Sequence, residues 1–150
     1  MPKPRKCMIA IPSCQDAIKV STMRMICDAM VDAKIDPNPV YFDIPQMEAV
    51  VPISAARNFG LALFMASDCD DLFFIDDDIS AERGAMMRLL NSSVDFVGGV
   101  YPHRIDADAH NGRSYPVQWA GIGSLDRHPD HGLLEVHGCA AGFLRLKRVV

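Results

Sequence analysis

Short apolar runs that stop at polar residues or proline alternate, along the first hundred residues, with segments in which apolar residues recur every three to four positions. The runs are typical of strands buried in a parallel sheet, and the helical spacing is typical of amphipathic helices. We expect strands at residues 7–11, 40–43, 72–76 and 95–101, and helices at 16–35, 54–67 and 82–90. This alternation predicts right-handed crossovers and an α/β fold, with a mostly parallel sheet flanked by helices.

The two longer helices should each bury one apolar stripe against the sheet. In the first helix the stripe comprises Ile18, Thr22, Met25, Ile26, Ala29, Met30 and Ala33, and in the second it comprises Ala56, Phe59, Gly60, Leu63 and Phe64. Asp16 is placed to favour the N-terminus of the first helix, because a negative charge there complements the helix dipole.

The pattern changes after Tyr101. A polar segment at 103–114, which we expect to be a loop ordered only by a ligand, precedes short strand-like runs at 117–119 and 133–136. These two runs predict a small antiparallel addition near the C-terminus. Residues 143–147 then alternate as a strand with one polar face.

Length and charge narrow the class of protein. A chain of 150 residues, 49% of them hydrophobic, suffices for one domain, so we expect a single domain over 1–150. A net charge of -4 argues against a nucleic-acid-binding protein. Five cysteines at scattered spacings predict buried free thiols. No run reaches the roughly 18–20 apolar residues of a membrane span, and we expect a soluble cytoplasmic protein.

The most informative segment is 72–78, where four apolar residues stop at Asp76, Asp77 and Asp78. Three adjacent carboxylates at the carboxyl edge of a sheet favour a hard divalent cation, since unneutralised they repel one another. Because alternate side chains of an extended chain share a face, Asp76 and Asp78 can reach one ion while Asp77 points elsewhere. A solvated acidic turn is the alternative interpretation.

Other strand ends add to this edge. Pro12 and Ser13 follow the first expected strand, and Asp43 closes the second. Ligands of open parallel sheets bind beyond the carboxyl ends of the strands. One crevice could therefore hold a pocket lined by backbone groups, a carboxylate and a metal ion. This combination would suit a nucleoside diphosphate with a bridging cation.

From about residue 7 to residue 147 the chain resembles the nucleotide-sugar-binding half of glycosyltransferases with the Rossmann-like GT-A fold, particularly family-two-like enzymes. The motifs that carry the resemblance are Ile-Ala-Ile-Pro-Ser at 9–13, Ala-Arg-Asn-Phe-Gly-Leu-Ala at 56–62, Phe-Ile-Asp-Asp-Asp at 74–78, Val-Gly-Gly at 97–99 and Gly-Cys-Ala-Ala-Gly-Phe at 138–143. An Asp-x-Asp motif alone is weak evidence for this family. Ala-Arg-Asn-x-Gly upstream of a hydrophobic strand that ends in acidic residues is strong evidence.

The resemblance implies a role for each acidic residue. Asp76 and Asp78 would hold Mn²⁺ or Mg²⁺ against the diphosphate, so that the charge of the departing nucleotide is neutralised. Asp77 would face the ribose or sugar hydroxyls of the donor. Arg57 and Asn58 resemble the Arg-Asn pair beside the donor, with Arg57 pairing with Asp76 or a phosphate.

By the same resemblance, Asp43 meets the base or ribose, and Pro12 and Ser13 line the base pocket mainly through backbone groups. Gly142 belongs to a small-residue turn under the sugar. Residues 14–16, Cys-Gln-Asp, stand where these enzymes often have an aromatic residue and an Asn, which leaves the identity of the base open.

The function implied is transfer of a sugar from a UDP- or GDP-linked donor to a hydroxyl of a glycan, lipid-linked or protein acceptor. In inverting members the catalytic base usually lies in a later segment, so we assign none. Either the chain is a domain truncated at its C-terminus, or catalysis uses other groups, or the domain only binds. Two alternatives remain open. One is a non-catalytic nucleotide-sugar or carbohydrate-binding module, and the other is a haloacid dehalogenase-type phosphatase, because residues 76–80 also fit an Asp-x-Asp-x-Ser loop.

Overall fold

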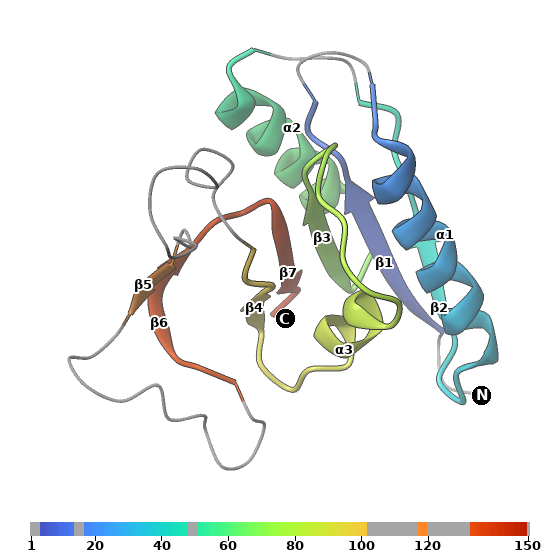
Figure 1. Cartoon of the computed structure of the whole chain (residues 1–150). Helices are drawn as coiled ribbons and strands as arrows, with labels where there is room; N and C mark the ends of the chain where they lie inside the picture. The colour runs from blue at the N-terminus through green and yellow to red at the C-terminus, as the bar shows by residue number, and fades with distance from the viewer. Residues whose placement is uncertain (1–3, 14–16, 48–50, 102–116, 120–132, 150) are drawn as a thin grey trace.

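The computed structural model describes residues 4–13, 17–47, 51–101, 117–119 and 133–149 (Figure 1). Its elements, in chain order, are β1 (Arg5–Ala10), α1 (Val20–Ile35), β2 (Val40–Asp43), α2 (Ile53–Ala66), β3 (Asp71–Ile75), α3 (Ala85–Leu90), β4 (Phe96–Gly98), β5 (Val117–Trp119), β6 (Val136–Cys139) and β7 (Phe143–Lys147). The expected α/β class is confirmed.

A five-stranded mixed sheet with the order β2-β1-β3-β7-β4 forms the centre of the fold. The β1–β2 and β1–β3 pairs are parallel, as the alternation of strand and helix predicts. β7, however, is antiparallel to both β3 and β4 and lies between them. The sheet is therefore mixed, because β7 pairs with the facing edges of both β3 and β4.

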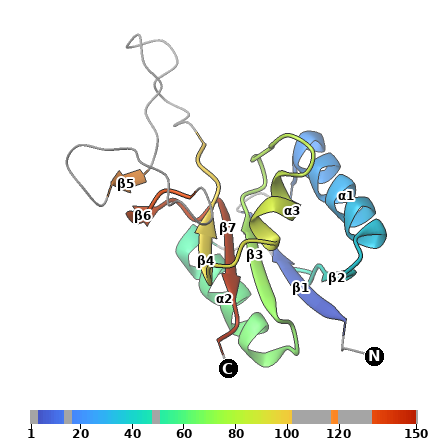
Figure 2. The same ribbon diagram turned by 90° about the horizontal axis from the view of Figure 1, so that it is seen from below.

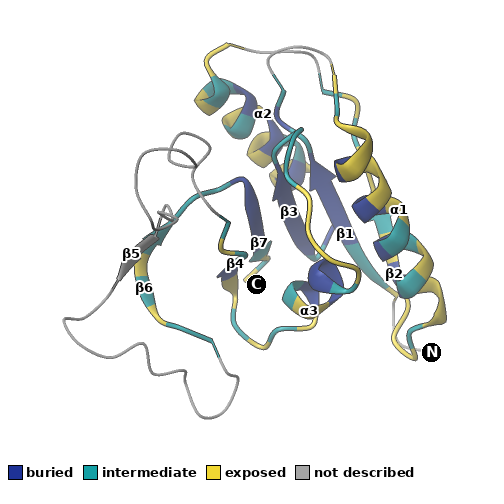
Figure 3. Cartoon of the chain, viewed as in Figure 1, coloured by how far each residue is buried: buried dark blue, intermediate teal, exposed yellow. Residues whose placement is uncertain are grey.

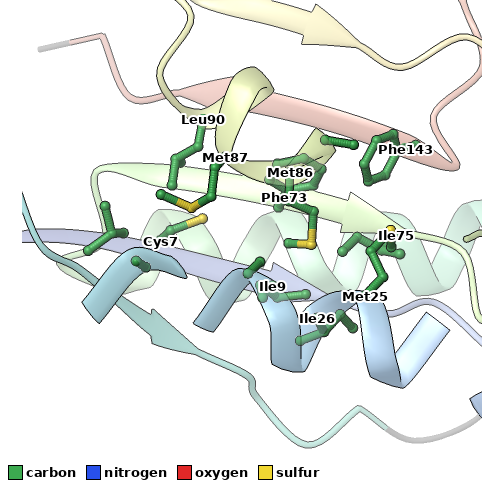
Figure 4. Packing of buried hydrophobic residues seen from close by; sticks show 14 residues of the cluster. Cys7, Ile9, Met25, Ile26, Phe73, Ile75, Met86, Met87, Leu90 and Phe143 are labelled. Carbon is green, nitrogen blue, oxygen red and sulfur yellow. The ribbon is translucent and has the colours of Figure 1, made fainter. Parts of the chain in front are cut away.

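Helices cover both faces of this sheet, as two views show (Figures 1 and 2). α1 and α3 lie on one face, where they enclose the larger apolar cluster around Ile9, Ile26 and Phe73 (Figure 4). α2 lies on the other face over a second cluster that includes Phe64 and Phe74. The buried residues accordingly concentrate on the sheet and on the helix sides that face it (Figure 3).

The helical stripes are largely as expected. α1 buries Thr22, Met25, Ile26, Ala29 and Ala33. α2 buries Ala56, Gly60 and Phe64, but Phe59 is 44% exposed and Leu63 only half-buried. The expected stripe of α2 was thus too wide, because the face that reaches the sheet is narrow. Gly60 lies there because a Cβ would come within 3.0 Å of the Cβ of Ala10.

Several expected boundaries need correction. The first helix begins at Val20, and Asp16 lies outside the described residues. The second antiparallel strand is Val136–Cys139 and not 133–136, and it pairs with Val117–Trp119. The polar segment 103–114 also lies outside the described residues.

The expected polar face of β7 is only partly present. Arg145 is fully buried, because its guanidinium donates to the backbone carbonyls of Leu89, Leu90, Ser92 and Val94 around the C-terminus of α3. Lys147, by contrast, is exposed. Of the cysteines described, Cys7 and Cys69 are buried, Cys139 is half-buried and Cys27 is exposed, all as free thiols.

Candidate functional site

One edge of the sheet collects the residues that carry chemistry. The parallel strands β1, β2 and β3 end there, and β4 runs in the direction of β3 because both are antiparallel to β7. The residues after β3 and β4 and those before β7 therefore share this edge. They include Asp76, Tyr101 and Gly142.

Asp76 is held by Arg57 from the start of α2. Nη2 of Arg57 donates to Oδ1 of Asp76 at 2.8 Å and to Oδ2 at 3.1 Å. The expected pairing of these residues is confirmed, but both contacts come from one nitrogen, so the pair is not a two-nitrogen fork. The Nε of Arg57 is buried and has no hydrogen-bond partner in the described part of the chain.

Gly142 lies directly against the other side of Asp76. The backbone N–H of Asp76 donates to the carbonyl of Gly142 at 2.8 Å. The N–H of Gly142 donates to the hydroxyl oxygen of Tyr101 at 3.1 Å. A Cβ on Gly142 would come closer than 3.0 Å to both that hydroxyl oxygen and Oδ2 of Asp76. Only glycine leaves these two side chains where they are.

This environment shifts the pKa of the Tyr101 phenol. Burial raises its pKa, the N–H of Gly142 lowers it, and the negative charge of Asp76 raises it again. The result is a pKa above the ordinary value near 10. The hydroxyl therefore keeps its proton at neutral pH.

Asp77 turns to a different partner. The Ser13 hydroxyl donates to Oδ2 of Asp77 at 2.6 Å, which ties the end of β1 to the acidic turn. The carbonyl of Asp77 accepts from the N–H of Lys19 and the hydroxyl of Thr22 at the start of α1. Asp76 and Asp77 thus diverge, as the alternation of side chains predicts, while Asp78 is half-buried in the same turn.

The remaining predicted residues lie apart from these contacts. Pro12 is fully buried after β1, so it presents no exposed surface to a ligand. Asp43 is exposed at the end of β2, and Asn58 is exposed on α2. Within the described residues, the structure shows Asp76, Arg57 and Gly142 in one cluster and Ser13 with Asp77 in another.

Tyr101 was not predicted as a site residue. The available signal is an aromatic residue two positions after Gly98-Gly99 at a strand end. A Cβ on Gly99 would collide with the ring of Phe143, and its N–H donates to the Phe143 carbonyl at 2.8 Å. The glycine pair thus lets the chain pass close to β7 on its way to Tyr101.

The expected metal site would offer a hard cation few ligands from the protein. No group of three or more His, Cys, Asp or Glu side chains that could hold a metal occurs among the described residues. Mg²⁺ is commonly bound by one or two carboxylates together with substrate phosphates and water. Asp76 and Asp78 would supply that number, and Arg57 already donates to both oxygens of Asp76.

The chain was compared with protein-family models, curated proteins and solved structures, and none matched it. Across the described residues, no helix combines the length and apolarity needed to cross a membrane. The interpretation of the site therefore depends on its geometry and on the motifs of the sequence.

Arg57→Lys is expected to weaken binding of a diphosphate ligand roughly tenfold, about 1.4 kcal/mol, while folding stability stays unchanged. A lysine can keep one ionic contact to Asp76. Because its side chain is shorter and does not reach both carboxylate oxygens, the carboxylate is held less firmly. The variant also removes the buried Nε–H that lacks a partner, and this gain in stability offsets the loss of one contact to Asp76, so the net change in folding stability is small. Calorimetric titration and urea unfolding would measure the two quantities.

Arg88→Lys is the matched control, since Arg88 is exposed on α3 and pairs with Glu82 away from the acidic turn. Equal losses of binding in both variants would contradict a role for Arg57 in the site.

Proposed function

We propose that this chain is a GT-A-like donor-binding domain of a glycosyltransferase. It binds a nucleotide-diphospho-sugar with Mn²⁺ or Mg²⁺ at the carboxyl edge of the sheet, and the sugar is transferred to an acceptor hydroxyl. The observation that carries the proposal is the turn after β3, where Asp76 is fixed between Arg57 and Gly142. A carboxylate fixed in this way at a sheet edge is preorganised for a ligand.

The chain's own residues divide the work. Asp76 and Asp78 would hold the cation, which neutralises charge on the departing nucleoside diphosphate. Arg57 keeps the Asp76 carboxylate in place through its two contacts. Ser13 keeps Asp77 turned toward the end of β1, where Asp77 would meet the ribose or sugar hydroxyls of the donor. Asp43 and Asn58, both exposed at or near this edge, remain available to the base and ribose.

Two alternatives predict different outcomes. A haloacid dehalogenase-type phosphatase would use Asp76 as a nucleophile, whereas the proposed glycosyltransferase would use it only to hold the cation. Treatment with phosphate analogues would label Asp76 only in that case. A non-catalytic binding module would bind the donor without consuming it, so donor turnover separates it from the enzyme.

Removing the metal is expected to weaken UDP or GDP binding at least tenfold, about 1.4 kcal/mol. Without a cation, the diphosphate would face the carboxylates of Asp76 and Asp78 directly, and like charges repel. Calorimetric titration of UDP and GDP in Mn²⁺ and in EDTA measures the difference. Equal affinity in the two buffers, or no binding in either, would refute the proposed site.

A further inference from the structure

Two side-chain oxygens of different chemistry lie against Gly142, which is buried and leaves no room for a Cβ. They are the hydroxyl of Tyr101 and Oδ2 of Asp76, both of which lie within 3.0 Å of the point where a Cβ on Gly142 would be. Neither is sealed off, since the Asp76 side chain is 25% exposed and Tyr101 is half-buried.

The hydrogen-bonding capacity of Tyr101 is only half used. Its oxygen accepts from the Gly142 N–H, and its own O–H proton has no acceptor among the described residues. A phenol can donate and accept at the same time. Tyr101 therefore offers a donor next to Asp76, which, when ionised, offers only acceptors.

A donor beside an acceptor selects for a group that accepts and donates. A sugar hydroxyl does both. A phosphate oxygen only accepts and has no proton to donate to Asp76, so it could meet that carboxylate only through a cation. An ammonium only donates and would leave the Tyr101 proton unused. Among the parts of a nucleotide-diphospho-sugar, hydroxyl groups fit this pair best.

We infer that Tyr101 is a ligand-binding residue that donates a hydrogen bond to a hydroxyl of the donor's sugar, while the same hydroxyl donates to Asp76. The inference rests on the proposed function and adds a residue that recognises the sugar of the donor and not its nucleotide. Gly142 contributes by holding Tyr101 through its N–H and by having no side chain.

The test compares Tyr101→Phe with the native chain in calorimetric titrations with Mn²⁺. The probes are UDP-glucose, UDP-galactose, GDP-mannose and dTDP-glucose, each against the corresponding nucleoside diphosphate. We expect Tyr101→Phe to weaken at least one sugar nucleotide roughly three- to tenfold, the range for one hydrogen bond, and to leave the diphosphates unchanged. Tyr41→Phe is the matched control, because Tyr41 is 60% exposed on β2.

A donor lacking one sugar hydroxyl sharpens the test. Removal of the hydroxyl that meets Tyr101 should weaken binding to the native chain and have little further effect on Tyr101→Phe, because the two changes delete the same bond. Additive losses at every hydroxyl position would contradict the inference.

The outcomes separate the inference from the proposed function. If the native chain binds none of the sugar nucleotides, the proposed function fails and the inference fails with it. If it binds them and Tyr101→Phe binds them equally well, or loses the diphosphates to the same degree, only the inference is overturned. Thermal unfolding of each variant confirms that the comparison is between folded proteins.

Discussion

Asp71→Asn is expected to lower the free energy of unfolding by roughly 3–5 kcal/mol, the cost of breaking a buried ion pair by removing one partner. Asp71 begins β3 and is fully buried. Arg5 donates to both of its oxygens, from Nε at 2.6 Å and from Nη2 at 2.8 Å. The Nε of Arg145 lies 3.6 Å from Oδ1. An asparagine would leave two cations without their shared negative charge.

The burial of Arg145 makes this dependence stronger. Burial lowers the pKa of its guanidinium, and the charge of Asp71 is the main effect that raises it. The guanidinium is otherwise surrounded by backbone carbonyls, which satisfy its N–H groups without cancelling its charge. Since small domains are stable by about 5–15 kcal/mol, the loss should be a large share of the total.

Urea unfolding followed by circular dichroism measures this loss, with Asp68→Asn as the control. Asp68 also pairs with a cation, Lys6, at 2.6 Å, but its side chain is 63% exposed. We expect Asp68→Asn to leave the unfolding midpoint almost unchanged. In an Arg5→Met background, Asp71→Asn should cost less, because one of the two cations is already gone. A small effect of Asp71→Asn in the native background would show that the ion pairs of Asp71 with Arg5 and Arg145 are not required for stability.

The sequence predicts the parts of the fold that depend on local patterns. The first three strands and the two long helices follow from apolar runs and helical spacing, each of which is contained in a short window. The parallel pairing of β1 with β2 and with β3 follows because strands joined through helices need crossovers, whereas their order in the sheet does not. Asp76 was one of the two partners that the family resemblance implied for Arg57, the other being a phosphate.

The parts that were missed depend on contacts between distant segments. The alternation of residues 143–147 assigns Arg145 to a polar face, and nothing local indicates that carbonyls around α3 could satisfy it in the interior. The position of β7 between β3 and β4 likewise depends on pairings far apart in the chain. Tyr101 was missed for the same reason, because its importance comes from Gly142, forty-one residues away.

Gly142→Ala is expected to weaken donor binding by roughly 2–4 kcal/mol, because it acts on both sides of the site at once. The neutral hydrogen bond from Tyr101 contributes about 0.5–1.5 kcal/mol, and the bond to the charged Asp76 contributes about 1.5–3 kcal/mol. The new Cβ would lie within 3.0 Å of the Tyr101 hydroxyl and of Oδ2 of Asp76. Both atoms are the ends of side chains, so they can move away and let the fold survive. Stability should therefore fall only by about 1–3 kcal/mol, the usual cost of overpacking.

Gly98→Ala is the control that separates overpacking from damage to the site. Its Cβ would lie 2.9 Å from Sγ of Cys139 and 3.6 Å from Cδ1 of Leu144, so it crowds the same edge of the sheet without contacting Asp76 or Tyr101. We expect the two variants to lose similar stability in urea unfolding, whereas only Gly142→Ala loses affinity for the sugar nucleotides in calorimetry. If Gly98→Ala lost as much affinity, the effect would belong to the packing of this edge in general. The contacts of Gly142 with Asp76 and Tyr101 would then not be specifically required for binding.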